Sequence, residues 1–410
     1  MKGIFVIMDG VADKPCQILG NITPLQDAKT PNLDALARKG KLDYCYTVKE
    51  GYTPESDAGV ISLLGYDFVF EQRGPLEALG AGVKLTNGDL ALRCNFATID
   101  DLENRHVMDR RAGRNLTTKE ARILSKAIND NVKLPFPFEF ISTIQQRAVL
   151  VIRGGFSDNI SGVEADKKGK LSFAHSEDDD DEQAELSAEV VNNFIRQSHK
   201  ILDSHPINIA RSRKGFYSAN AILCRGAGSK TMRFKKMKGK WMAMGYMPVE
   251  KGIAKVTGMD SYNFRYPRLK GMDAYANLYD GLKQATKYAG RMISWYKKKY
   301  DYFYVHFKET DSAGHDNKPL DKVKMIEMID QRFFGYVRKL IERDPNLKLI
   351  VTADHSTPCV DKGHSADPVP VLSLPSRDGK DREQRFTEEQ GLEGKKIFGR
   401  KLLGEKFFSK

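Results

Sequence analysis

The stretch Gly3-Ile4-Phe5-Val6-Ile7-Met8, followed at once by Asp9, decides the expected fold. A short apolar run rich in β-branched residues is typical of a strand buried on both faces, as in a parallel sheet. The runs Arg147–Ile152, Tyr302–Phe307 and Leu347–Thr352 have the same character. The first run is too short for the core of a signal peptide, which needs about 7–15 apolar residues. We therefore expect a parallel sheet whose first strand begins at Gly3.

Helical patterns lie between these runs. Thr30–Gly40 combines a cap residue, a proline at the first helical position and a glycine just past the end. Ser187–Leu202 and Leu320–Arg343 carry apolar residues at helical spacing. The alternation of strands and helices predicts an α/β protein with a mainly parallel sheet and helices on both faces.

The composition excludes several classes of protein. The chain has 410 residues, 40% of them hydrophobic, with 34 glycines. It can bury a large core, which excludes wholesale disorder and a small disulfide-rich fold. No apolar run approaches the roughly 18–20 residues that span a bilayer, so we expect no membrane partner. The five cysteines include no C-x-x-C pair, which favours reduced thiols and a cytoplasmic location.

The length is that of two or three domains. Gln72–Pro75 and Arg225–Lys230 have the glycine and proline content of linkers. We expect residues 71–228 to form a second, inserted α/β domain. Residues 1–70 and 229–410 would then form one discontinuous domain.

The net charge of +12 is unevenly distributed. Residues 225–300 alone carry +14, and the other 334 residues sum to −2. This basic stretch has no recognition motif and no regular aromatic interleaving, so we expect no nucleic-acid partner. A solvated surface, or one that steers an anionic substrate, explains it better. The acidic run Glu177–Glu182 predicts an exposed loop.

Three predicted strands end in side chains that commonly bind metals. These are Asp9 after the first strand, Asp311 and His315 after the second, and Asp354 and His355 after the third, with His364 nearby. Since parallel strands bring their carboxyl ends to one edge of a sheet, we expect these groups to meet there. A single aspartate after a strand is usually a turn or cap residue, but three such endings favour a site.

The ligand types narrow the choice of metal. Carboxylates and imidazoles without a thiolate suit Mn, Zn, Co or Fe. Six groups are too many for one catalytic ion that keeps an open position. Two ions, about 3.5–4 Å apart, fit a phosphoryl displacement better.

Ser56 is the candidate nucleophile. It lies where a loop enters a short helix that Gly65 ends. The unpaired N–H groups and the dipole at a helix N-terminus favour a phosphate there. The alternative, that Ser56 is simply the N-cap, remains open on this stretch alone.

Eight short motifs together resemble a known family. They are Met8-Asp9-Gly10, Thr30–Asp34, Glu55-Ser56-Asp57 with Leu64–Asp67, Arg73–Gly80, Asp109–Arg114, Ala219–Leu223, Asp311–His315 and Asp354–Pro358. Their order is similar to that of the archaeal-type cofactor-independent phosphoglycerate mutases, which belong to the alkaline phosphatase superfamily. The resemblance covers nearly the whole chain.

The resemblance implies a two-metal site and a reaction. One ion would be held by Asp311, His315 and His364, and the other by Asp9, Ser56, Asp354 and His355. Ser56 would accept the phosphoryl group of 3-phosphoglycerate and return it to the 2-hydroxyl, in glycolysis and gluconeogenesis. The ions would be divalent (Mn, Zn, Co or Mg, with Mn favoured), and 2,3-bisphosphoglycerate would not be needed.

A mutase must also keep water from the phosphoserine, which calls for a closing lid. The inserted stretch is the candidate, and its Arg110, Arg111 and Arg114 could clamp the carboxylate or phosphate of the substrate. The alternative is an ordinary charged turn. The resemblance places a phosphate-neutralising lysine near Lys251. Arg211, Arg213 and Arg225 are further candidates.

Glu55 departs from the family pattern, which more often has glycine before the nucleophile. A carboxylate beside an anionic substrate must point away or pair with a cation. The alternative function is a metal-dependent phosphohydrolase with the same two-metal core. The insert and its arginines favour the mutase.

Overall fold

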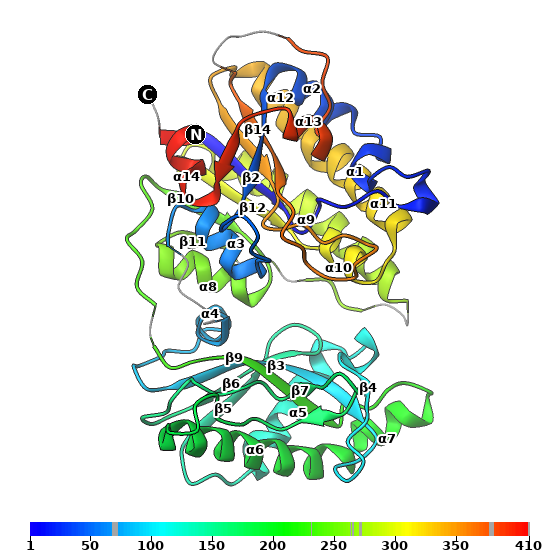
Figure 1. The fold of residues 1–410 in the computed structure, drawn as a ribbon, viewed down its shortest axis with the longest axis vertical. Coiled ribbons are helices and arrows are strands. Elements are labelled where there is room, and N and C mark those ends of the chain that lie inside the picture. Colours follow the sequence, from blue (N-terminus) through cyan, green and yellow to red (C-terminus); the bar gives the residue numbers. More distant parts are fainter. Residues whose placement is uncertain are drawn as a thin grey trace.

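The computed structural model describes residues 1–67, 73–230, 232–262, 264, 266–269, 273–376 and 381–408. The chain forms two large sheets, each covered by helices, that lie one above the other in Figure 1. None of the helices in these ranges is both long and apolar enough to cross a membrane.

The main sheet has eight strands. Their bounds are β1 Gly3–Met8, β2 Lys41–Tyr46, β10 Trp241–Met244, β11 Asp260–Ser261, β12 Tyr302–Phe307, β13 Lys348–Thr352, β14 Val369–Leu374 and β15 Lys396–Phe398. The order is β11-β10-β12-β1-β13-β14-β2-β15. Only β14 runs antiparallel to its neighbours, β13 and β2. The predicted α/β fold with a mainly parallel sheet is therefore confirmed.

β1 lies at the centre of this sheet because every one of its side chains can be buried. All six of its residues are buried. Val6 pairs with Val305 of β12 on one side and with Val351 of β13 on the other. This register brings the ends of the three strands level at one edge.

Two groups of helices cover the main sheet (Figure 1). One contains α1 Pro24–Asp27, α2 Pro31–Lys39, α9 Ala274–Tyr296, α10 Glu309–His315, α11 Pro319–Ile329 and α12 Gly335–Arg343. The other contains α3 Ser56–Leu63, α8 Pro248–Thr257 and α14 Gly399–Leu403. The short helix α13 Glu388–Leu392 packs on β2 and β14.

The structure contains the predicted helices, but one of them is interrupted. α2 begins at Pro31 after its cap residue Thr30, as expected. The helix predicted over Leu320–Arg343 is broken by a π-helical turn at Asp330–Phe334. The turn accompanies a tertiary contact, since the buried Asp330 carboxylate accepts a hydrogen bond from the backbone N–H of Leu33 at 2.7 Å.

The second sheet comes from the middle of the chain. Its strands are β3 Leu90–Ile99, β4 Val107–Asp109, β5 Phe138–Ser142, β6 Arg147–Ile152 and β9 Ala221–Gly228, and all its pairings are antiparallel. α5 Thr118–Asn131 and α6 Glu182–Asp203 cover one face, and α4 Arg73–Gly80 covers the other (Figure 1). A small hairpin, β7 Glu164–Ala165 and β8 Leu171–Ser172, and the helix α7 Pro206–Arg213 complete this region.

Two expectations for this region were wrong. Arg147–Ile152 is a strand with the predicted bounds, but it is antiparallel rather than parallel. Helices cover both faces of this sheet, so the strand is buried whichever way it runs. A continuous apolar run therefore does not distinguish a parallel from an antiparallel strand. The loop predicted at Arg225–Lys230 is mostly strand, because β9 continues to Gly228.

The predicted domain boundaries stay a prediction. Residues 71 and 72, where the insert was expected to begin, lie outside the described residues, and Arg73–Pro75 open helix α4. The acidic run Glu177–Glu182 is largely exposed, as expected, and Asp181 caps the N-terminus of α6.

Candidate active site

The predicted strand endings meet at one edge of the main sheet. Asp9 follows β1, Asp311 lies in α10 just after β12, and Asp354 follows β13. The backbone N–H of Asp9 donates to the carbonyl of Phe307 at 2.9 Å, which aligns the ends of β1 and β12. The geometry of parallel strands thus assembles the cluster.

The first donor group contains Asp9, Asp354 and His355, all buried. His355 Nε2 lies 3.4 Å from Asp9 Oδ1 and 3.5 Å from Asp354 Oδ2. Among the described residues, Asp9 Oδ1 and Asp354 Oδ2 have no hydrogen-bond partner. Buried carboxylate oxygens without partners are costly, so this group fits a bound cation.

The second donor group centres on Asp311. Its Oδ1 lies 3.4 Å from His315 Nε2 and 3.5 Å from His364 Nε2. The two imidazole nitrogens are themselves 3.2 Å apart. His355 is also close enough to share this group. The structure brings together all the predicted metal ligands, while the division of ligands between two ions stays a prediction.

Each histidine is held by its second ring nitrogen. His364 Nδ1 lies 2.9 Å from the carbonyl of Pro54, and His315 Nδ1 lies 3.1 Å from the carbonyl of Lys362. His355 Nδ1 lies 3.0 Å from the hydroxyl of Thr357. Such contacts orient metal-binding imidazoles. Burial also lowers the pKa of His355, which favours the neutral form that binds a metal.

Ser56 lies beside His355, which is close to both donor groups. It is the first residue of α3 and follows the N-cap Glu55, so the alternative reading of Ser56 as the cap is wrong. Its Oγ lies 3.2 Å from His355 Nε2. Gly59 permits this approach, because a Cβ there would lie 2.2 Å from the carbonyl oxygen of Asp354.

Lys308 and His306 complete the surroundings of Asp9 and were not predicted as site residues. Lys308 Nζ donates to Ser56 Oγ at 2.9 Å and also to Asp9 Oδ2. His306 Nε2 lies 2.8 Å from the same Asp9 oxygen. His306 is near the end of β12 and Lys308 follows the strand, just before the predicted ligand Asp311. Their position at the carboxyl end of a predicted strand could therefore have identified them from the sequence.

The charges of this cluster stabilise one another. Burial alone would lower the pKa of Lys308, but Asp9 and Asp311 raise it above its usual value. Burial alone would raise the pKa of Asp9, yet Lys308 and His306 hold it well below its usual range. Lys308 is therefore an ammonium ion that faces the Ser56 hydroxyl.

A cavity of about 440 Å³ opens above Ser56 and is lined by arginines. Three come from the second sheet, Arg93, Arg147 and Arg225, and the others are Arg73, Arg110 and Arg111. The cavity also contains Asp311, His315 and His364. Four of these arginines, at 73, 93, 147 and 225, come from separate elements, and only Arg225 was among the sequence candidates.

The three arginines that were predicted to bind the substrate, Arg110, Arg111 and Arg114, differ in their contacts. Arg110 pairs with Glu164 at the rim of the cavity. Burial, together with Arg114 and Arg147, lowers the pKa of Arg111 to about 10. Arg114 donates to both carboxylate oxygens of Asp316, at 2.6 Å to Oδ1, and lines a neighbouring cavity rather than that of Ser56.

The remaining candidates lie away from Ser56. Lys251, on α8, lines a different cavity, so its role stays a prediction. Arg211 is buried beside the Asn115 side chain, to which it donates at 2.5 Å, and Arg213 lines none of the described cavities. Glu55 pairs with Arg73 at 3.0 Å, which is the second of the two arrangements expected for it, pointing away or pairing with a cation.

A third donor group, Asp13, Cys16 and Cys359, lies outside this site. The buried ammonium of Lys322 donates to Asp13 Oδ2 at 2.6 Å and to the carbonyl of Thr357 at 3.0 Å. Since a side-chain cation already neutralises Asp13, this group fits a metal less well than the other two.

Comparisons with known proteins agree with the site. A family model described as 2,3-bisphosphoglycerate-independent phosphoglycerate mutase matches residues 37–208. A protein of that name from Thermococcus gammatolerans is 39% identical over 399 residues, covering 96% of this chain and 93% of the relative. The chain belongs to the family of 2,3-bisphosphoglycerate-independent phosphoglycerate mutases. The resemblance inferred from the eight motifs is thereby confirmed.

Other relatives extend the comparison. The protein of that name from Methanopyrus kandleri is 36% identical, covering 96% of this chain and 92% of its own length. The solved cofactor-independent phosphoglycerate mutase of Thermoplasma acidophilum aligns with a TM-score of 0.56 and 26% identity, covering 100% of this chain and 99% of that one. A solved protein of Pyrococcus horikoshii aligns with a TM-score of 0.75 and 28% identity, covering 99% and 96%.

Proposed function

We propose that this protein interconverts 3-phosphoglycerate and 2-phosphoglycerate through a phosphoserine at Ser56, without 2,3-bisphosphoglycerate. One observation carries the proposal. The Ser56 hydroxyl lies 2.9 Å from an ammonium group and 3.2 Å from an imidazole nitrogen, on the floor of a cavity lined by arginines. A nucleophile held beneath cations suits phosphoryl transfer.

The arginines would bind the substrate. Phosphoglycerate carries a carboxylate and a phosphate, and guanidinium groups pair with both in bidentate fashion. Arg93 is a candidate for this role because it lines the cavity and its Nη1 has no hydrogen-bond partner among the described residues, while its Nε lies 3.4 Å from the buried Glu77 carboxylate. Arg111, whose partially buried charge faces the same cavity, is a second candidate.

The transfer conserves atoms and protons. Ser56 Oγ forms a bond to phosphorus as the bond from phosphorus to the 3-oxygen of glycerate breaks. After glycerate reorients, its 2-oxygen takes the phosphoryl group from Oγ, and the proton lost by one hydroxyl is matched by the proton gained by the other. Lys308 Nζ would donate its hydrogen bond to Oγ while negative charge is on that atom.

The two donor groups would each hold a divalent ion, with Mn favoured and Zn, Co and Mg as alternatives. Such ions lower the pKa of a nearby hydroxyl and stabilise charge on phosphoryl oxygens. Asp9, Asp354 and His355 would hold one, with Ser56 beside it, and Asp311, His315 and His364 the other. A role in glycolysis and gluconeogenesis would place the protein in the cytoplasm.

Residues 71–228 would act as the lid that keeps water from the phosphoserine. Arg114 supports this role, because its pair with Asp316 links the region of the second sheet to the end of α10, next to His315. Tyr275 donates to the same Asp316 carboxylate at 2.9 Å. The Arg114–Asp316 pair would hold the cavity closed during transfer, and Tyr275 would keep the Asp316 carboxylate in place.

The experiment that tests the proposal compares two products. The protein is supplied with 3-phosphoglycerate and Mn²⁺, without 2,3-bisphosphoglycerate, and both 2-phosphoglycerate and free phosphate are measured. We expect the isomer to accumulate to equilibrium with little free phosphate. Release of phosphate without isomer would instead identify a phosphohydrolase.

A further inference from the structure

A second large cavity, of about 980 Å³, lies between the region of the second sheet and that of the main sheet. One wall comes from the start of α5 and from residues 143–145, between β5 and β6. The other wall comes from Lys251 of α8 and from Phe264 and residues 266–269. The cavity does not include Ser56 or any of the proposed metal ligands.

Four cations line this cavity: Lys119 and Arg122 on α5, and Lys251 and Arg268 on the opposite wall. No acidic side chain is among the described residues that line it. None of the four cations forms an ion pair within the described part of the chain, in contrast to Arg110 and Arg114. Unpaired charges of one sign in a concave surface attract counter-ions strongly.

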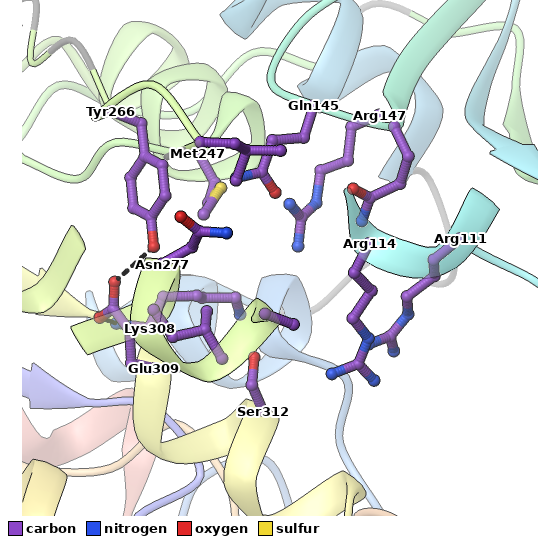
Figure 2. Close-up of a pocket in the computed structure, with 14 residues that line it drawn as sticks. Arg111, Arg114, Gln145, Arg147, Met247, Tyr266, Asn277, Lys308, Glu309 and Ser312 are labelled. Carbon is purple, nitrogen blue, oxygen red and sulfur yellow. Dashed lines mark hydrogen bonds between the residues drawn. The ribbon is translucent and has the colours of Figure 1, made fainter. Parts of the chain in front are cut away.

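The cavity is separated from the active site by a narrow space. That space has a volume of only about 50 Å³ and is lined by Arg111, Gln145, Arg147 and Tyr266, among others (Figure 2). Tyr266 donates to Glu309 at 3.2 Å across one side of it (Figure 2). The second cavity and the cavity above Ser56 share no lining residue among those described, so they are distinct sites.

The lining also suits a small organic ligand. Lys119 and Arg122 are three residues apart on α5, so they lie on the same face of the helix. Thr118 and Thr143 add hydroxyl groups, and Phe264, Tyr266 and Leu269 add apolar surface. The size is at the upper end of the range of small-molecule pockets, about 300–1,000 Å³.

We propose that this cavity is a second anion-binding site, for a small phosphorylated molecule with at least two anionic groups. Charges on both walls favour a ligand that bridges them. Such a ligand would favour the arrangement in which the walls are close, since a ligand stabilises the state that it binds best. The proposal does not depend on the reaction at Ser56.

The test uses fructose 1,6-bisphosphate as the probe, titrated calorimetrically into the full-length, metal-loaded protein. Titrations are made with and without excess 3-phosphoglycerate, which should occupy the active-site cavity. The variant K119M/R122M removes two cations from exposed positions on α5, where methionine preserves the helix. The control K126M/K133M removes the same charge from exposed positions that do not line the cavity.

We expect the wild type to bind the probe in the presence of 3-phosphoglycerate. K119M/R122M should bind it at least tenfold more weakly, and K126M/K133M should bind it as the wild type does. Both variants should keep mutase activity within twofold in the absence of the probe. Equal affinity of K119M/R122M and the wild type, or complete displacement of the probe by 3-phosphoglycerate, would overturn the proposal.

Discussion

Lys308 connects the proposed nucleophile, Ser56, to Asp9 of the first donor group. Its ammonium contacts both Ser56 Oγ and the Asp9 carboxylate. A donor that is already in place costs no reorganisation when charge develops on Oγ. This is the reason to expect a catalytic rather than a purely structural role for Lys308.

Replacing Lys308 with methionine should therefore lower kcat by about 10²–10³-fold, the usual effect of removing one such donor. Lys308→Arg keeps the charge and should recover part of the loss. Steady-state kinetics on both variants checks this, with thermal unfolding to show that they remain folded. A Lys308→Met enzyme within a few fold of the wild type would exclude the role.

Single residues also show what sequence patterns cannot decide. Asp9, Asp354 and His355 follow strands, so their meeting could be predicted from sheet topology alone. The guanidinium of Arg114 pairs with Asp316, more than 200 positions away in the chain, while its predicted role as a substrate clamp stays a prediction. The partner of a charged side chain is a long-range property that its local sequence does not contain.

At the scale of elements, α13 ties the loop after β1 to the rest of the main sheet. Glu388, in its first turn, accepts hydrogen bonds from the Asp13 N–H at 2.9 Å and from the Thr23 hydroxyl at 2.8 Å. Burial raises the pKa of Glu388 from 4.5 to about 7, although these donors and Lys322 act in the opposite direction. The folded protein therefore holds this proton more tightly than the unfolded chain.

The sign of the pH dependence follows from this difference. The stability contributed by protonated Glu388 is fully present below pH 4.5 and is lost as the pH rises through about 7. Glu388→Gln should remove this loss, so the stability of the wild type relative to the variant should fall by on the order of 2 kcal/mol between about pH 5 and pH 8. Urea unfolding at both pH values measures it. A constant difference between the two proteins would contradict the assignment.

The elements also show where periodicity is informative. β1, β12 and β6 have the bounds that their apolar runs predicted, because burial on both faces leaves a clear pattern. The interruption of the helix at Asp330 could not be predicted, since its partner Leu33 lies in α2. The same limitation applies to the antiparallel direction of β6.

On the scale of the whole molecule, the second sheet supplies three of the six arginines that line the cavity above Ser56. Arg93 and Arg147 project from β3 and β6 toward a site built on the main sheet. No local motif marks them, because the cavity exists only once the two sheets face each other. Part of the charge excess at 225–300 lies at the second cavity, which Lys251 and Arg268 line. Lys240 lies elsewhere, since its backbone N–H donates to the Asp301 carboxylate, just before β12 begins at Tyr302.

The central claim is that the phosphoryl group passes through Ser56. The most direct measurement is mass spectrometry of peptides from the enzyme quenched during turnover of 3-phosphoglycerate, with Ser56→Ala as the control. The account predicts one added phosphoryl group on the peptide that contains Ser56, and neither the adduct nor isomerisation in Ser56→Ala. Isomerisation by Ser56→Ala at a rate near that of the wild type would contradict it.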